Sequence, residues 1–376
     1  MEKLLMSCQQ PVCFQTLKTA SGKLIGVATL NAEKALNALN LDMLRLLTKQ
    51  LTDWKNDSEI ACVVLDGCGE KAFCAGGDVR ALYDASIESK GEIAAAAQTF
   101  FTEEYQLDFL IHEFGKPLLV WGNGFVMGGG VGLMAGASHR VVTETSQIAM
   151  PEVTIGLYPD VGGSYFLNRM PGKTGLFLGL TAYQMSAADA CYVGMANHFL
   201  NNDDKELMFD AMATLDWSGD IGMDHQRLDE MLNELTYKTA MPKGESVLAL
   251  NQGLIDTLMT GSLTDIVARI GEIETDEKWL SRAKSAMLAG SPISWQLIYR
   301  QTQLDESLTL ADTFRWELAV SVNCLAVGDF NEGVRALLID KDRNPKWHYG
   351  SVGTIPSELI DKITSSPWES HPLADL

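Results

Sequence analysis

The sequence predicts an α/β core followed by a mostly helical region. In the first part, a plan of strand, glycine-rich loop and helix occurs twice, about fifty residues apart. Strands that alternate with helices indicate a core with parallel strand pairing. From about Lys205 onward the strand signals stop, and amphipathic helical windows follow one another. We therefore expect an α/β core over residues 1–204 and a helical region over residues 205–376.

The first elements of the core are a hairpin, a helix and a buried strand. Residues 12–17 and 24–30 have the composition of strands and are separated by a turn-rich tetrad. Asn40 is suited to cap a helix that ends near Asn56, and residues 62–65 form a short apolar strand. An apolar stripe on one face of that helix comprises Leu44, Leu47, Leu51 and Trp54.

The repeated plan then begins. Asp78 is placed to open a helix after the first glycine loop. A second round has a strand at 118–121, a glycine turn, a small-residue helix and a strand at 140–143. The helical windows of the second part are 228–235, 246–258, 262–273 and 312–327. Their apolar stripes are expected to face a core or another subunit rather than a cofactor.

Composition and charge narrow the class of protein. The chain has 376 residues, of which 46% are hydrophobic and 21% charged, so it can bury a sizeable core. The net charge is -20 and no block of Lys or Arg stands out, which argues against a nucleic-acid partner. A small phosphorylated ligand stays compatible with this charge if a few local cations hold it.

The cysteines and histidines predict no metal site. The seven cysteines are an odd number without a Cys-x-x-Cys pair, so we expect reduced thiols in a cytoplasmic protein. Cys62, Cys68 and Cys74 are evenly spaced but lack the tight pair that zinc sites use. The six histidines are scattered, and His139 and His198 are expected to be structural.

Neither a membrane span nor a targeting leader is expected. Residues 117–138 carry no charge and are long enough to cross a bilayer, but they contain seven glycines and Asn123. A glycine-dense turn in lipid would leave backbone groups unpaired. Residues 1–10 carry only a short apolar run.

Two glycine loops supply backbone amides. Gly128-Gly129-Gly130 follows a strand and precedes a helix, and the loop at 74–78 supplies a second set of N–H groups, as an oxyanion site requires. A dinucleotide fold is the alternative, with Gly122, Gly124 and Gly128 in the turn and an acidic residue at the end of the next strand. That glycine spacing is off by one and leaves the first loop without a role. The pattern alone leaves both interpretations open.

Two carboxylates follow prolines downstream. Glu152 comes after Pro151 and Asp160 after Pro159, among apolar neighbours. A carboxylate in such a pocket has a raised pKa, which suits a base or proton donor. Two solvated loop carboxylates are the alternative. No Gly-x-Ser-x-Gly nucleophile motif occurs.

Three motifs together carry a family resemblance. KAFCAGGD at 71–78, GNGFVMGGGVGL at 122–133 and MPEVTIGLYPDVGGSYFL at 150–167 resemble the crotonase (enoyl-CoA hydratase/isomerase) superfamily. FFTEEY at 100–105 and DFNEGVRALLIDKDRNPKW at 329–347 are similar to its 3-hydroxyisobutyryl-CoA hydrolase branch. The resemblance implies a spiral of repeated ββα units that holds the active site, followed by a helical C-terminal region.

The resemblance also implies an oxyanion hole for the thioester carbonyl of a coenzyme A substrate. Its two N–H groups fall on Gly77 and Gly129. Ala75, Gly76 and Gly128 belong to the same two loops. Coenzyme A is then part of the substrate, and no further cofactor is expected.

The carboxylate pattern favours hydrolysis within this family. Gly132 stands where hydratases carry their first glutamate, Glu152 matches the second, and Asp160 replaces a usual glycine. The resemblance implies that 3-hydroxyisobutyryl-CoA is hydrolysed, a step of valine degradation. Glu152 is expected to attack the carbonyl or to activate water, and Asp160 to orient the 3-hydroxyl or pass a proton to the leaving thiolate.

Three further residues are expected to contact the substrate. By resemblance Glu104 hydrogen-bonds it, although a surface salt bridge is nearly as good an interpretation of this residue. Lys34 and Lys71 lie where relatives wrap the adenosine and phosphates, but Ala32-Glu33 stands where the family commonly has Arg-Pro.

Other assignments stay open at this point. An enoyl-CoA hydratase or isomerase of the same fold is the first alternative, and a non-catalytic binding protein of this fold is the second. A homo-oligomer, trimer or hexamer, is expected because relatives assemble through C-terminal helices, although this longer tail can instead cover its own subunit.

Overall fold

The computed structural model describes residues 8–238, 244–305 and 307–376. The chain forms two compact units, each built from three stretches. Unit 1 comprises Met1–Gly77, Gln106–Ile148 and Met185–Ala249, and unit 2 comprises Asp78–Tyr105, Ala149–Gln184 and Leu250–Leu376. The units do not follow the expected division after residue 204, because the chain leaves unit 1 and returns to it twice before that point.

Unit 1 contains a six-stranded sheet. Its order is β1-β2-β3-β5-β7-β9, and β1 and β2 form the expected antiparallel hairpin, while the other neighbouring strands are parallel. The bounds are Val12–Lys18, Leu24–Leu30, Ile60–Gly67, Leu118–Gly122, His139–Val142 and His198–Phe199. Because the strand order follows the chain order without a reversal, the sheet has no switch point of the kind that binds dinucleotides. The acidic residue of the dinucleotide alternative, Glu144, instead accepts a hydrogen bond from Asn202 N at 2.9 Å.

A second sheet explains the repeat seen in the sequence. Its order is β4-β6-β8, with bounds Ala72–Cys74, Phe125–Met127 and Gln147–Ala149. In each repeat the chain passes from the large sheet to the small one and then into a helix, as in α3 (Val79–Ser89) and α5 (Gly129–Ala135). This confirms the predicted ββα spiral.

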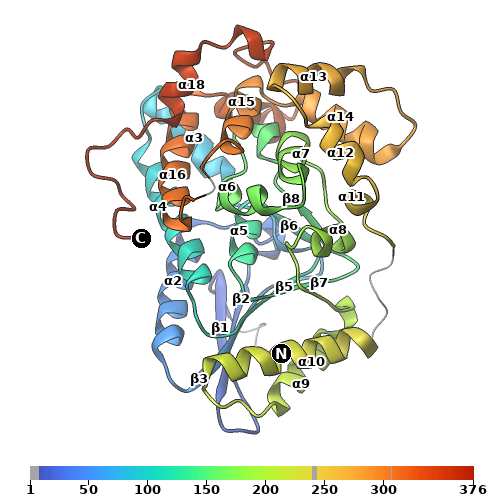
Figure 1. Cartoon of the computed structure of the whole chain (residues 1–376). Helices are drawn as coiled ribbons and strands as arrows, with labels where there is room; N and C mark the ends of the chain where they lie inside the picture. The colour runs from blue at the N-terminus through green and yellow to red at the C-terminus, as the bar shows by residue number, and fades with distance from the viewer. Residues whose placement is uncertain (1–7, 239–243, 306) are drawn as a thin grey trace. The chain divides into compact units, whose positions relative to one another are not determined.

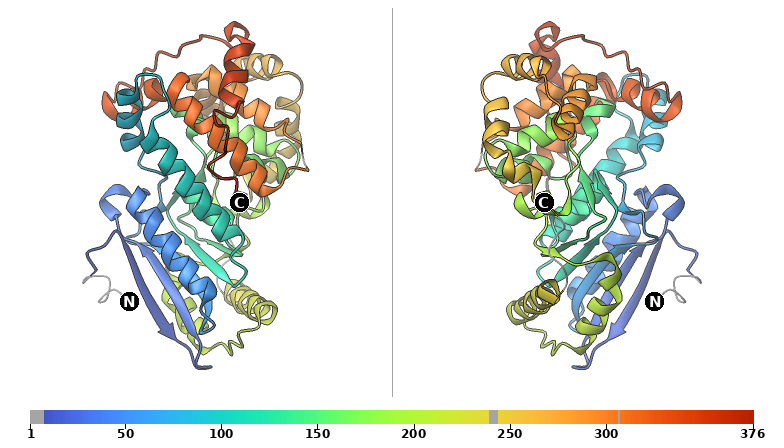
Figure 2. Two further views of the ribbon diagram at one scale, coloured as in Figure 1. Left: turned by 90° about the vertical axis from the view of Figure 1, so that its left-hand side faces the viewer. Right: turned by 90° about the vertical axis from the view of Figure 1, so that its right-hand side faces the viewer.

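The helices of unit 1 cover the large sheet. Helix α2 (Leu41–Asn56) lies against β1, β2 and β3 (Figure 2), and the Asn40 side chain caps it by accepting from Met43 N. Helices α9 (Lys205–Thr214) and α10 (Ile221–Lys238) lie side by side on the sheet (Figure 1), where Leu228 and Leu232 pack with Trp121. The short helices are α8 (Ala187–Tyr192) and α11 (Val247–Leu250).

Unit 2 is mostly helical. Among the described residues no strand follows β9, as expected for the C-terminal region. The expected helix at 246–258 is divided at Asn251 between α11 and α12. The helix bounds are Ala95–His112 (α4, which continues into unit 1), Gly163–Phe166 (α6), Thr174–Thr181 (α7), Gln252–Leu258 (α12), Leu263–Glu272 (α13), Lys278–Ala289 (α14), Pro292–Gln301 (α15), Leu310–Val327 (α16), Phe330–Val334 (α17) and Ser357–Thr364 (α18).

One expectation about the cysteines was wrong. Cys8 and Cys13 form a disulfide, with Cα atoms 6.1 Å apart, whereas Cys62, Cys68, Cys74, Cys191 and Cys324 are not disulfide-bonded. The two partners are only five residues apart and lie within ordinary disulfide reach.

The apolar stretch at 117–138 is divided among β5, β6 and α5. Across the described ranges, no helix has the length and apolar character to cross a membrane. Most of the segment on which the leader expectation rests, residues 1–7, lies outside the described residues.

Candidate active site

The two predicted amide loops are in contact within unit 1. Strands β4 and β6 are parallel, so the loops that follow them leave the same end of the small sheet. A Cβ atom placed on Gly76 would lie 3.4 Å from Met127 O and 3.9 Å from Gly129 N. The N–H of Gly129 opens helix α5, and N–H groups in a first helical turn have no acceptor within the helix. Residues 75–77 and 128–129 therefore form one amide-bearing surface.

Glycine is required for this approach of the two loops. Gly76 has φ of 109° and Gly128 has φ of 49°, both in the left-handed region. A Cβ atom on Gly130 would lie 2.3 Å from Cys74 O, which is a direct collision with the backbone. The glycine run thus allows α5 to begin against the first loop.

Three carboxylates gather in unit 2. Glu104 lies on α4, Glu152 begins the short 3₁₀ helix Glu152–Ile155, and Asp160 follows it in the chain. Their exposed fractions are 3%, 5% and 5%. This burial excludes a surface salt bridge for Glu104. It also excludes solvated loop positions for Glu152 and Asp160.

Mutual repulsion and burial shift the titration of these groups. Burial raises the pKa of Glu104 and of Glu152 well above the usual range, and the nearby Asp160 carboxyl raises both further. Burial raises the pKa of Asp160 to about 6, while the hydrogen bond from Tyr105 counteracts this rise. Asp160 is therefore the member of the group that ionises most readily.

Glu152 keeps one oxygen open. Its Oε2 atom is buried and has no hydrogen-bond partner among the described residues. A buried carboxylate oxygen without a donor costs free energy in the folded state, and such sites are often functional. The open oxygen is available to a substrate or a water molecule.

A chain of hydroxyl groups supports Asp160. Tyr105 donates to Asp160 Oδ2 at 2.6 Å, so its own oxygen accepts from Ser321 at 2.8 Å. Tyr158 lies 3.2 Å from Ser321 Oγ and donates to Glu317 O at 2.9 Å. Sequence reasoning missed Tyr105 and Ser321 as parts of the site.

Glu317 holds the loop that carries Asp160. Its two carboxylate oxygens accept from Gly162 N at 2.7 Å and from Ser164 N at 2.8 Å. Val161, a β-branched residue, has φ of 50°, a strained conformation that needs such support.

Glu317 and Ser321 lie one turn apart on α16, inside the apolar stripe predicted at 312–327. Polar residues on that buried face were the signal that could have revealed them.

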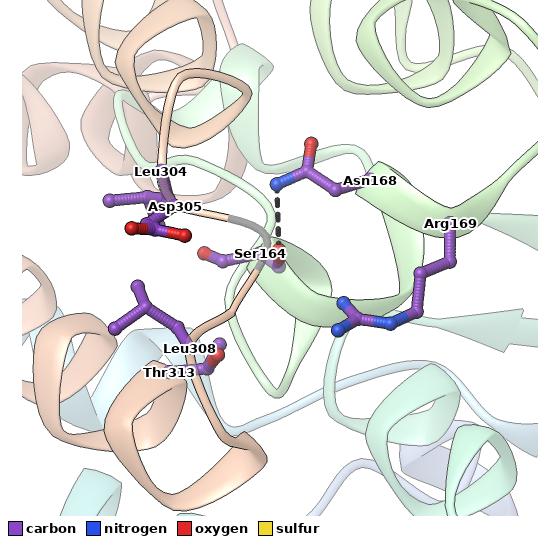
Figure 3. A pocket seen from close by; sticks show the side chains of 7 residues that line it. All are labelled: Ser164, Asn168, Arg169, Leu304, Asp305, Leu308 and Thr313. Atoms are coloured by element: carbon purple, nitrogen blue, oxygen red, sulfur yellow. Dashed lines mark hydrogen bonds between the residues drawn. The ribbon is translucent and has the colours of Figure 1, made fainter.

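A cavity of about 320 Å³ lies beside this loop in unit 2. Figure 3 shows Asn168 donating to Ser164 O, with the Arg169 side chain extending from the same segment. The lining residues are Ser164, Asn168, Arg169, Leu304, Asp305, Leu308 and Thr313. None of the three clustered carboxylates lines this cavity, so it is separate from the carboxylate group.

The two lysines predicted to hold the nucleotide are exposed in unit 1. Neither Lys34 nor Lys71 lines the 560 Å³ cavity of that unit, although their neighbours Glu33 and Glu70 do. The cation in that lining, Lys205, pairs with an aspartate at 2.7 Å. The roles of Lys34 and Lys71 stay predictions.

Comparison with known proteins identifies the family. A family model described as enoyl-CoA hydratase/isomerase matches residues 25–364. The chain belongs to this family. A relative in Danio rerio, called 3-hydroxyisobutyryl-CoA hydrolase, mitochondrial, is 40% identical over 343 residues, which cover 91% of this chain and 87% of the relative. A human relative of the same name is 34% identical over 338 residues, which cover 89% of this chain and 85% of the relative.

Solved structures of the enoyl-CoA hydratase/isomerase family share the fold. A structure described as an enoyl-CoA hydratase from Rhodobacter sphaeroides 2.4.1 has a TM-score of 0.81 at 33% identity, covering 95% of this chain and 98% of its own. The relatives' names thus include both hydrolase and hydratase. Those relatives called hydrolases are described as mitochondrial, and the cytoplasmic location expected for this chain stays a prediction.

Proposed function

We propose that this protein hydrolyses an acyl-CoA thioester, with 3-hydroxyisobutyryl-CoA as its substrate, and so serves valine degradation. The observation that carries the proposal is the buried carboxylate group with an open oxygen on Glu152. Gly132 stands in place of the first of the two glutamates that hydratases of this family use to add water to a double bond, so only Glu152 of that pair is present. The names of the Danio rerio and human relatives support the same assignment.

The mechanism assigns the carbonyl oxygen to the backbone. The Gly77 and Gly129 amides donate to it, and the contact between their loops supports this role. Glu152 supplies electrons to the carbonyl carbon, either by forming an acyl–glutamyl anhydride or by removing a proton from water. The C–S bond then breaks, and the thiolate takes up a proton from water. On the anhydride path a water molecule next hydrolyses the acyl–glutamyl bond, which frees the acid and restores the Glu152 carboxylate, whereas on the other path the activated water forms the acid directly. No further cofactor takes part.

Asp160 is assigned to the substrate hydroxyl. Tyr105 already donates to its Oδ2, and a pKa of about 6 keeps it ionised at neutral pH. An ionised carboxylate accepts a hydrogen bond from the 3-hydroxyl and thereby fixes the acyl chain. Glu104 is the second carboxyl assigned to this polar end of the substrate, and Lys34 and Lys71 to the nucleotide phosphates.

The test is release of a thiol from (S)-3-hydroxyisobutyryl-CoA, followed with a thiol reagent. We expect turnover by the parent chain, loss in Glu152→Gln, and no hydration of crotonyl-CoA, measured as loss of its conjugated absorbance. Multiple turnovers in H₂¹⁸O followed by peptide mass analysis separate the two roles of Glu152, because only an anhydride path places label in its carboxylate. Absence of hydrolysis with every short 3-hydroxyacyl-CoA would favour a binding protein of this fold.

The assembly state is part of the proposal. Relatives of this fold commonly associate, and we propose a trimer or hexamer in solution in the cytoplasm. Light scattering coupled to gel filtration measures the mass of the particle against 41.1 kDa for one chain.

A further inference from the structure

Two histidines and one aspartate meet on one face of unit 1. His139 begins β7, His198 begins β9, and Asp229 lies on α10. The parallel pairing places Val141 opposite His198, so His139, two residues before Val141, points to the same side of the sheet. Helix α10 packs on that side and brings Asp229 to both rings. The two histidines were predicted to be structural because the histidines of the chain are scattered and no motif surrounds them.

The distances suit a metal ion. Asp229 Oδ1 lies 3.0 Å from His198 Nε2 and 3.3 Å from His139 Nε2, and the candidate ligand atoms lie within 4.8 Å of one another. Zinc bonds of about 2.0–2.1 Å in a tetrahedron separate neighbouring ligand atoms by about 3.3 Å. The two rings are nearly parallel and buried, whereas the Asp229 side chain is 52% exposed and leaves a path for entry.

The surroundings of His139 Nε2 favour a cation beside it. When Ser138 Oγ donates its proton to Leu118 O at 3.1 Å, it accepts from His139 Nδ1 at 2.9 Å. In that tautomer Nε2 of the neutral ring carries a lone pair. This lone pair faces a carboxylate oxygen and makes no hydrogen bond with any described residue. Two acceptors at this distance repel each other unless a cation lies between them.

We propose that His139, His198 and Asp229 bind a late first-row divalent cation such as Zn²⁺, with water completing the coordination. Two imidazoles and one carboxylate match the ligands that zinc prefers. Ser138 Oγ lies 2.9 Å from His139 Nδ1, in the position that outer hydrogen-bond partners of zinc-binding histidines occupy. The ion ties α10 to β7 and β9. His225 stacks on His139, but its Nε2 bonds to Gly115 O at 2.8 Å, so it is not assigned as a ligand.

Zinc binding by the full chain is the test. Chelator-treated protein is loaded with zinc chloride, freed of excess ion by gel filtration, and assayed for metal by mass spectrometry. We expect about one zinc per chain and a rise in the midpoint of thermal unfolding. Competition with a chromophoric chelator should show at least about tenfold weaker binding in Asp229→Asn and His198→Gln. His225→Gln, which removes a neighbouring ring without removing a ligand, should bind as the parent does.

Free thiols are the competing ligands, and cobalt(II) distinguishes them. Cobalt(II) bound at the proposed site should give no thiolate-to-metal charge-transfer band, because its ligands are nitrogen and oxygen atoms, whereas binding to the cysteines would give one. Asp229 is half-exposed, so Asp229→Asn should fold, and circular dichroism checks this. Absence of bound zinc, a thiolate band, or unchanged affinity in folded Asp229→Asn would each overturn the proposal.

Discussion

Glu317 and Glu152 are both buried carboxylates of unit 2, but their surroundings differ. Glu317 accepts two backbone N–H bonds and clamps the loop around Val161, whereas Glu152 has an oxygen that no described residue contacts through a hydrogen bond. Burial raises the pKa of both, to about 8 in Glu317. Burial alone therefore does not distinguish the role of Glu317 from that of Glu152. The satisfied carboxylate stabilises the fold, and the open one is available for chemistry.

The comparison is tested most strongly by Glu152→Gln. The amide has nearly the same shape but neither attacks a carbonyl nor accepts a proton from water, so we expect kcat to fall roughly 10³-fold. The free energy of unfolding should stay the same or rise, because the neutral amide replaces a carboxyl group whose ionised form is destabilised by burial and by Asp160. Thiol release and urea unfolding of the same preparation give both values. A loss of activity accompanied by an equal loss of stability would make Glu152 a structural residue like Glu317.

Glu317→Gln should lower the stability of the fold, which Glu152→Gln should not. Its amide nitrogen would face one of the two backbone donors, at Gly162 or Ser164, so we expect the free energy of unfolding to fall by roughly 2–4 kcal/mol. Urea unfolding measures the loss, and Glu369→Gln, at an exposed position, is the matched control. Full stability of Glu317→Gln would show that the clamp does not hold the loop.

Local signals explain what the sequence predicted well. The cap at Asn40 and the pairing of the first two strands as a hairpin depend on neighbouring residues, and the structure has both. Glu152 and Asp160 were recognisable because each follows a proline within one motif.

Contacts between distant segments explain what was missed. Tyr105 and Ser321 are 216 residues apart, and Glu317 reaches Gly162 across 155 residues. No spacing in the chain encodes such pairs. The Cys8–Cys13 pair was missed for a different reason, because the cysteines were judged by their number and by the compartment expected for the chain.

Asp160→Asn tests how much stability the carboxylate group costs. The pKa of Asp160 is about 6 in the folded chain and 3.8 in the unfolded chain. Between these two pH values the folded chain binds more protons than the unfolded chain. The free energy of unfolding therefore falls as pH rises from about 4 to about 6. The cost is absent below about pH 4 and complete above about pH 6.5, where it reaches about 3 kcal/mol. Asp160→Asn should therefore be more stable than the parent at pH 8, by up to that amount, and equally stable near pH 4. Urea unfolding at both values measures it, and a stability difference independent of pH would contradict the assignment.

Tyr105→Phe should have the smallest effect. Its hydroxyl lowers the pKa of Asp160 by donating to the ionised form, so its loss should move the acidic limb of kcat/KM upward from about pH 6. At pH 8 the rate should fall only about threefold to tenfold, the value of one hydrogen bond to a charged group. Tyr158→Phe is the control, because that hydroxyl donates to Glu317 O rather than to Asp160. An activity that instead falls as pH rises through 6 would show that Asp160 acts as a proton donor and would contradict its assignment as an ionised acceptor.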